Sequence, residues 1–180
     1  MKYKVIGITL LVLIIGVLAN FGGSMNQVQI TKEYNFDEKL VWAQWSDISK
    51  ISDFHPDLVS SPIISNKTSG LGTQRKVTTT DGKELIHEIF EYNDTQQTLA
   101  FTFKADFLPI KDGRCFISIK SKRAGKATLD FKVTMQPKFG FLGTILGKLV
   151  LEPKLAAGGH NLLNGLESYL IERYLKEMGE

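Results

Sequence analysis

The chain has 180 residues, of which 43% are hydrophobic and 23% charged, and its formal net charge is +3. These values are ordinary for one globular domain that is long enough to bury a core. The modest charge and the lack of a basic stripe interleaved with aromatics argue against nucleic acid as a partner. A single cysteine, Cys115, excludes an internal disulfide. Its position in a predicted strand favours a small buried hydrophobe over a catalytic thiol.

Residues 1–23 form a targeting or anchoring segment that is separate from the fold. Two lysines precede an uncharged run, Val5–Ala19, that is rich in Leu, Ile and Val. As a helix, Val5–Gly23 would span roughly 28 Å, close to the thickness of a bilayer's hydrocarbon core. We expect either an N-terminal membrane anchor or a signal peptide cleaved after Ala19, with a buried core helix as the least favoured reading. Both main readings place residues 24–180, the second domain, on the extracytoplasmic side: anchored at the inner or plasma membrane, or periplasmic or secreted after cleavage.

The remaining chain begins with a predicted strand near Val28–Tyr34 and a helix over about Glu38–Trp45. A second short helix should end before His55-Pro56, because the residue before proline avoids the helical region. Alternation and turn residues then predict six strands, near Leu58–Ser65, Gly72–Thr79, Glu84–Tyr92, Thr98–Ala105, Arg114–Lys120 and Lys126–Met135. Lys111-Asp112-Gly113 is among the predicted turns.

A long amphipathic helix is predicted after Pro153, with a break or sharp bend at the proline. Its apolar residues recur at intervals of three and four up to Met178, which places them on one side of a helix of about 25 residues, roughly 37 Å long. Such a stripe needs a broad partner. The strands between two short helices and one long one predict an α+β fold in which the long helix lies across an antiparallel sheet. The two layers either close on each other or leave a cavity.

Three motifs carry a resemblance to a known family. They are Val41-Trp42-x-x-x-Ser46-Asp47 with Phe54-His55-Pro56, then Gly72-Thr-Gln-Arg75-Lys-Val77 with Asp81-Gly82 and His87-Glu88-Ile-Phe-Glu-Tyr-Asn93-Asp94, and finally Pro137-Lys-Phe-Gly140-Phe-Leu-Gly143. Their order and spacing resemble the polyketide cyclase/dehydrase and lipid transport group of the SRPBCC, or START-like (Bet v 1-like), superfamily. The resemblance implies a helix-grip fold: a curved seven-stranded antiparallel sheet wrapped around a long C-terminal helix, two short helices after strand 1, and a ligand cavity between sheet and helix.

The strand pattern suggests a polar pair in this cavity. Residues two apart on a strand share a face, so Arg75 goes with Val77, and Glu88 goes with Phe90. Arg75 and Glu88 lie on strands that we expect to be adjacent, and a charge among apolar neighbours is costly unless it is paired. We therefore expect the pair to anchor a ligand head group or to form a structural ion pair, and in relatives these motif positions can line the cavity. His87 is expected to point outward.

The other cavity candidates are Trp42, His55, Phe101, Phe103, Leu129, Phe131 and His160. For each of them a packing, capping or surface role is the competing interpretation, because core and pocket wall are the same surface in this fold. The three histidines are far apart and lack Cys or carboxylate neighbours at ligand spacing, so no metal site and no cofactor are expected.

Three functions are compatible with these features, because one fold hosts many activities. The first is an exported or membrane-tethered monomer that binds a hydrophobic small molecule or lipid. The second is a cyclase-like enzyme acting on an apolar substrate, in which Arg75 polarises a carbonyl while Glu88 or His55 moves a proton. The third is a ligand-free interaction module with a solid core.

Overall fold

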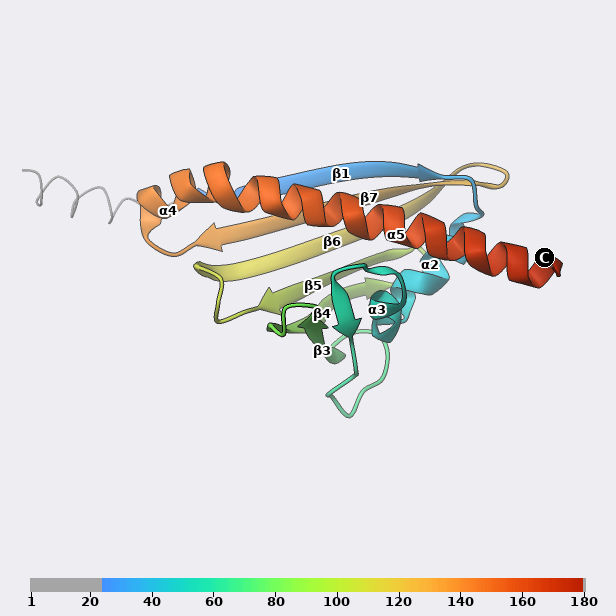
Figure 1. Cartoon of the computed structure of the whole chain (residues 1–180), viewed down its shortest axis with the longest axis horizontal. Coiled ribbons are helices and arrows are strands. Elements are labelled where there is room, and N and C mark those ends of the chain that lie inside the picture. Colours follow the sequence, from blue (N-terminus) through green and yellow to red (C-terminus); the bar gives the residue numbers. More distant parts are fainter. Residues whose placement is uncertain (1–23, 180) are drawn as a thin grey trace, which may run out of the picture.

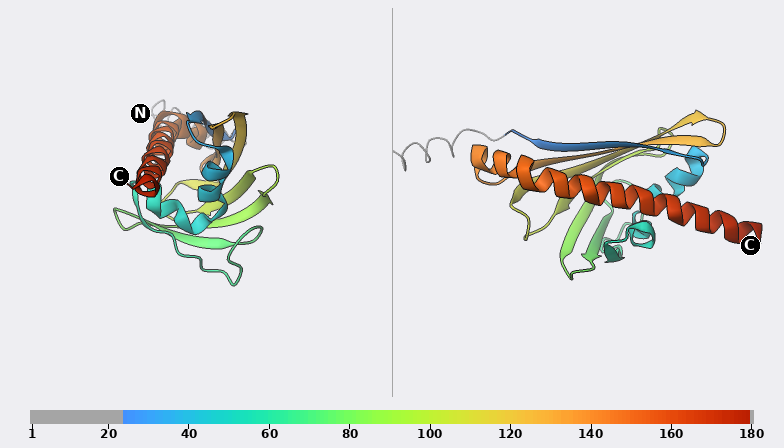
Figure 2. Two further views of the ribbon diagram at one scale, coloured as in Figure 1. Left: turned by 90° about the vertical axis from the view of Figure 1, so that its right-hand side faces the viewer. Right: turned by 45° about the horizontal axis from the view of Figure 1, so that its top comes forward.

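The computed structural model describes residues 24–179. Seven antiparallel strands form one curved sheet in the order β1-β7-β6-β5-β4-β3-β2, and the long C-terminal helix lies across its concave side (Figures 1 and 2). The elements are β1 (Asn26–Tyr34), α2 (Glu38–Ser46), η1 (Ile48–Lys50), α3 (Ile51–Phe54), β2 (Leu58–Ser60), β3 (Gln74–Thr79), β4 (Glu84–Asn93), β5 (Thr98–Lys104), β6 (Ile110–Arg123), β7 (Lys126–Pro137), α4 (Gly140–Leu146), η2 (Gly147–Leu151) and α5 (Glu152–Met178). The predicted α+β helix-grip fold is confirmed.

The predicted anchor or signal segment, residues 1–23, lies outside the described residues. Among the helices of residues 24–179, none is both long and apolar enough to cross a membrane.

Alternation of buried and exposed residues along the strands determines which face of the sheet is covered by the helices. On β7, Leu129, Phe131, Val133 and Met135 are buried while their neighbours in sequence, apart from Thr134, are more exposed. A strand pleat sends alternate side chains to opposite faces, so this pattern fixes which face packs against the helices. At the end of β1 the chain turns into α2, whose first turn is capped by the Asp37 carboxylate accepting from the Lys39 amide at 3.0 Å.

Helix α5 is attached to the sheet and to α3 by close contacts. Leu163 and Leu166 are fully buried, and the Tyr34 hydroxyl donates to the Leu163 carbonyl at 3.0 Å. Gly165 lies directly against α3, because a Cβ placed there would be 2.0 Å from the Phe54 carbonyl oxygen. The predicted apolar stripe ends earlier than expected. Residues 171–179 are all exposed, because the last turns of α5 extend beyond the sheet (Figure 1).

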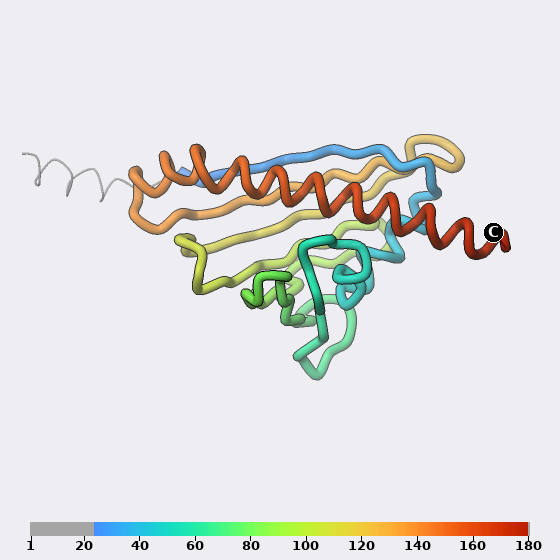
Figure 3. Tube along the Cα trace, in the orientation of Figure 1, coloured from blue at the N-terminus to red at the C-terminus, as the bar shows by residue number. Residues whose placement is uncertain are grey.

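Two local predictions are wrong. Pro153 neither breaks nor sharply bends the helix: α4, η2 and α5 follow one another without a gap (Figure 3), and the irregularity is the π-helical segment η2 just before the proline. Proline lacks the N–H that the preceding turn would use, and a wider turn accommodates this. The predicted turn at 111–113 is part of β6 instead, where Gly113 makes room for Phe103, whose ring atoms would be 2.5 Å from a Cβ there.

Candidate functional site

A cavity of about 290 Å³ lies between sheet and helix. Its floor is the concave face of β3–β7, its roof is the first half of α5, and α3 and the start of β2 close one side. Its lining is predominantly apolar and comprises Ile51, His55, Asp57, Leu58, Val77, Thr79, Leu85, His87, Phe101, Phe103, Leu108, Cys115, Phe131, Val133, Lys154, Leu155, Gly158, Gly159 and Leu162. An apolar pocket with a few polar groups is the usual make-up of a small-molecule site.

Two adjacent glycines of α5 shape the roof of the cavity. A Cβ at Gly159 would lie 2.7 Å from Ile30 Cδ1 and 3.1 Å from Phe131 Cε1, so this glycine lets the helix approach the sheet. A Cβ at Gly158 would meet no atom within 4 Å. Position 158 therefore borders open space, and a side chain there would extend into the cavity.

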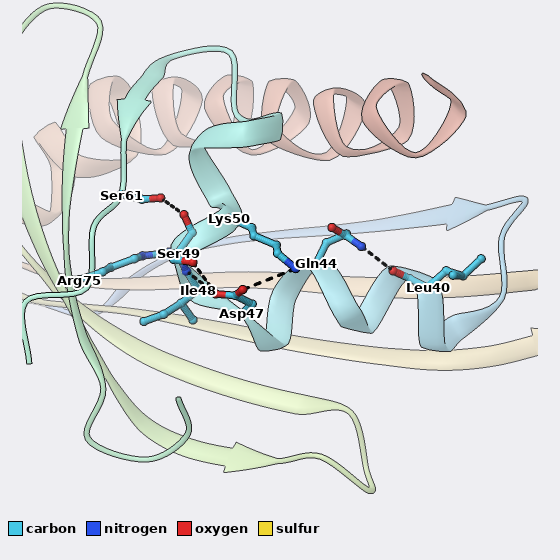
Figure 4. A network of polar contacts seen from close by, with 8 residues as sticks. All are labelled: Leu40, Gln44, Asp47, Ile48, Ser49, Lys50, Ser61 and Arg75. Atoms are coloured by element: carbon cyan, nitrogen blue, oxygen red, sulfur yellow. Dashed lines mark hydrogen bonds and ion pairs between the residues drawn. The ribbon is translucent and has the colours of Figure 1, made fainter. Parts of the chain in front are cut away.

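Behind the wall lies a buried arginine. Arg75 on β3 is opposite His87 on β4, and its Nε donates to His87 Nδ1 at 3.0 Å. Its Nη1 donates to the carbonyl of Ile48 in η1, which connects the strand to the short helices (Figure 4). The ring of Phe101 stacks on His87 at 4.7 Å between centroids, and Arg75 Cζ lies 5.2 Å from the same ring. Arg75 is only 2% exposed and is not part of the cavity wall.

Charge and burial fix the protonation of this pair. Burial lowers the pKa of Arg75 to about 9, so the guanidinium remains cationic at neutral pH. Burial, reinforced by the positive charge of Arg75, holds the pKa of His87 well below its usual value. His87 is therefore neutral. Because its Nδ1 accepts a hydrogen bond from Arg75, its single proton is on Nε2.

His55 is also neutral, and its Nδ1 is held by a different partner. Its Nδ1 accepts a hydrogen bond from the Asp57 amide at 3.2 Å, and burial lowers its pKa although Asp57 acts in the opposite direction. Both imidazoles line the cavity. Within residues 24–179, no group accepts a hydrogen bond from either Nε2. The apolar cavity thus contains two neutral N–H donors whose acceptor has to come from a ligand or from water.

The structure places the predicted site residues in several different locations. His55, Val77, Phe101, Phe103 and Phe131 line the cavity. Arg75 lies behind it, and Leu129 and Trp42 are buried in the packed core, where Trp42 Nε1 donates to Asp94 at 2.7 Å. His160 is exposed on α5.

The face of β4 was predicted wrongly. Glu88 and Phe90 lie on the outer face of the sheet, where Glu88 accepts from Gln74 Nε2 at 3.0 Å and Phe90 packs edge-on against Phe116. His87 points inward instead. The register pairs Arg75 with His87 and Gln74 with Glu88, so the expected Arg75–Glu88 ion pair does not form.

This correction also removes Glu88 and Arg75 from the predicted catalytic arrangement, while His55 remains on the cavity wall. Glu88 is on the far side of the sheet from the cavity, and the donors of Arg75 are bound to His87 and Ile48. Residues that sequence reasoning missed are His87, Leu155 and Gly158 on the wall, together with Cys115, whose thiol pKa is raised by burial. In residues 24–179 no three His, Cys, Asp or Glu side chains are grouped to hold a metal ion.

The two histidines predict a loss of stability in mild acid. A histidine with a lowered folded pKa binds its proton more readily in the unfolded chain, so the free energy of unfolding is fully retained above about pH 6.5 and falls as the pH drops below it. Each such group costs up to about 1.4 kcal/mol per pH unit until its folded pKa is reached. Urea denaturation between about pH 7.5 and 5 measures the slope.

The control variant is His87→Gln, whose amide oxygen can accept from Arg75 but does not titrate. It should flatten the slope, leaving the part contributed by His55. Equal slopes in the two proteins would show that His87 is not held neutral by the fold.

Comparisons with known proteins agree with this architecture. Residues 35–154 match the family described as polyketide cyclase/dehydrase and lipid transport. An aromatase/cyclase from Streptomyces sp. R1128 has a TM-score of 0.71 at 12% identity, over 84% of this chain and 96% of that one. Norcoclaurine synthase from Thalictrum flavum, in complex with dopamine and hydroxybenzaldehyde, has a TM-score of 0.65 at 14% identity, over 83% and 88%.

An uncharacterized protein from Bacillus thuringiensis is similar with a TM-score of 0.68 at 14% identity, over 81% of this chain and 99% of that one. No curated protein matches the sequence. At these identities the solved structures establish the fold alone, whereas the family match covers most of the domain. The chain belongs to the polyketide cyclase/dehydrase and lipid transport family.

Proposed function

We propose that this chain binds a hydrophobic small molecule or lipid that carries at least one hydrogen-bond acceptor. The observation that supports the proposal is the apolar cavity with two neutral imidazole donors, His55 and His87, on its wall. An unpartnered N–H in apolar surroundings costs free energy, and a ligand oxygen relieves that cost. The family description, which includes lipid transport, is consistent with this role.

The geometry narrows the ligand class. Neutral donors suit a neutral acceptor such as a carbonyl or hydroxyl oxygen, and the aromatic rings of Phe101 and Phe103 suit a flat or apolar body. A cavity of about 290 Å³ is at the lower end of ligand pockets. We therefore expect a small ligand, with its oxygen near the histidines and its apolar part under α5.

The decisive experiment fills the cavity from position 158. Gly158→Phe should lower the affinity for an apolar fluorescent probe at least about tenfold, which is about 1.4 kcal/mol. Gly158 lines the cavity, and a Cβ there meets no atom within 4 Å, so α5 does not have to move to accept the base of the new side chain. Native mass spectrometry of the purified full chain, followed by solvent extraction, should show a co-purified apolar compound in the wild type and none in the variant.

Two controls make the result interpretable. Gly158→Ala leaves most of the space free and should bind nearly as well as the wild type. His55→Leu removes one of the two N–H donors on the wall and should weaken binding of carbonyl-bearing compounds more than binding of hydrocarbons, because only the former use that donor. A full chain that binds no apolar compound would contradict the proposal and favour the ligand-free interaction module. A Gly158→Phe variant that binds like the wild type would contradict it too, by showing that the compound is bound outside this cavity.

We further propose that the domain lies at a membrane, on its extracytoplasmic side. Support comes from the sequence: two lysines followed by the uncharged run Val5–Ala19. The intact mass of the protein recovered from cells decides between an anchored chain that begins at Met1 and a mature chain that begins after Ala19.

A further inference from the structure

The helical segment before α5 is amphipathic, but its small residues face the fold and its large apolar side chains face outward. In residues 139–150 the side chains that face the fold are small: Gly143, Thr144 and Gly147 are buried. The large apolar side chains are exposed instead, and they are Phe139, Phe141, Leu142, Ile145, Leu146, Leu149 and Val150. We call these seven residues the α4–η2 face. Leu149 is 71% and Leu146 58% exposed, which is unusual for a contiguous apolar group on a soluble protein.

Close contacts prevent the segment from turning this face inward. A Cβ at Gly143 would lie 1.8 Å from the Lys138 carbonyl oxygen, and a Cβ at Gly147 would lie 2.4 Å from Asn26 Oδ1. Larger side chains therefore cannot take these positions. Asn26 Nδ2 also donates to the Thr144 carbonyl at 3.3 Å and to Glu152 at 2.8 Å, which ties the segment to the start of β1. The large apolar side chains of the segment therefore have to face outward.

The α4–η2 face lies where the described chain begins. The Thr144 hydroxyl donates to the Ser24 carbonyl at 3.2 Å, so residue 24 is directly beside the segment. Figure 1 shows the start of β1 and α4 at the same end of the molecule, opposite the free end of α5. Immediately upstream in the sequence, Val5–Gly23 carries no charged residue. The uncharged stretch is therefore joined, through Ser24, to the end of the domain at which the apolar face is exposed.

The charges beside the face are positive. Residues 138–151 contain Lys138 and Lys148 but no Asp or Glu, and the next acid along the chain, Glu152, accepts a hydrogen bond from Asn26. Lysine stems pack along apolar surface while their ammonium groups reach the headgroups. An apolar face bordered by lysines is typical of a helix lying in the interface of an anionic membrane.

We propose that the α4–η2 face inserts into the surface of a lipid bilayer and holds this end of the domain against it. This contact is independent of what the cavity binds. The segment leads directly into the first turns of α5, whose Lys154, Leu155 and Gly158 line the cavity, so docking brings the cavity wall close to the lipid surface.

The test uses the full chain, reconstituted into vesicles of phosphatidylcholine and phosphatidylglycerol. Leu149→Cys carries an environment-sensitive NBD label, and the buried native thiol of Cys115, with its raised pKa, does not compete for the reagent. We expect blue-shifted NBD emission that is quenched by lipids with a spin-labelled acyl chain. The matched control is Met178→Cys, which is similarly exposed, at 64%, on the opposite end of the domain. It should emit as in water and remain unquenched.

Two outcomes would overturn the proposal. Water-like emission from position 149 in vesicles would show that the face does not enter the bilayer. Blue-shifted emission that spin-labelled lipids fail to quench would show that protein covers the face, either the chain's own residues 1–23 or a second copy. Neither result bears on ligand binding, which the Gly158 variants test separately.

Discussion

Replacing Gly165 with alanine is expected to lower the free energy of unfolding by about 3 kcal/mol or more. The new Cβ would lie 2.0 Å from the carbonyl oxygen of Phe54, far inside contact distance, and 3.2 Å from Pro56 Cδ. Overpacking in a core typically costs about 1–3 kcal/mol when side chains can yield. Here the obstacle is the backbone at the end of α3, which cannot rotate away as a side chain can, so α5 and α3 would have to move apart. The gain of about 1 kcal/mol in helix propensity does not offset this.

Gly158→Ala provides the matched control, seven residues earlier on the same helix. Its Cβ meets nothing within 4 Å, so only the helix propensity changes and stability should rise by about 0.5–1 kcal/mol. Urea denaturation of the two variants measures the difference. Similar effects in both would mean that α5 does not pack on α3 as closely as described.

Arg75→Ala is the second variant for which a large effect is expected, a loss of about 3 kcal/mol. Arg75 is the largest of the fully buried side chains, so its removal leaves a cavity, and such truncations cost about 2–5 kcal/mol. The Ile48 carbonyl and His87 Nδ1 also lose their donor, at about 1–3 kcal/mol each when buried. The variant also no longer has to bury a cation, which offsets part of this loss. We therefore expect the free energy of unfolding to fall by about 3 kcal/mol, within the range for such truncations.

A second measurement distinguishes the electrostatic effect of Arg75 on His87 from the contribution of Arg75 to packing. Without the positive charge of Arg75, the pKa of His87 should rise towards its usual value, although burial still lowers it. NMR titration of the imidazole measures the change. Gln74→Ala, one residue away on the outer face, is the control and should cost about 0.5 kcal/mol or less. An Arg75→Ala protein as stable as the control, with an unshifted imidazole, would refute the arrangement.

The general fold was predictable because its patterns are local. β7 alternates cleanly over Leu129–Met135, and the long helix shows apolar residues at intervals of three and four up to Leu170. The proline after His55 marks the end of the second short helix, because the residue before a proline avoids the helical region. These signals depend on neighbours in sequence, so no tertiary information is needed to read them.

The candidate site was less predictable because β4 is ambiguous. Leu85, His87 and Ile89 alternate with Ile86, Glu88 and Phe90, so both faces of the strand look half apolar. A bulge between Ile89 and Glu91 shifts the register further along. Only the pairing of Arg75 with His87 decides which face is inside, and a pairing register cannot be read from one strand.

The π-helical segment η2 compensates for a rotational drift along the C-terminal helix. The positions that face the sheet recur every fourth residue: Gly143 lies against Pro137, Gly147 against Asn26 and Gly159 against Ile30. Between them, Leu151 and Leu155 are half-buried. In a regular α-helix every step of four residues overshoots a full turn by about 40°, so the contact line would rotate by about 160° from the first position to the last. A wider turn holds more residues per revolution and takes back part of this rotation. The chain therefore carries an additional residue in one turn. As a result Gly143 in α4 and Gly159 in α5 both face the sheet, although α4, η2 and α5 follow one another without a gap.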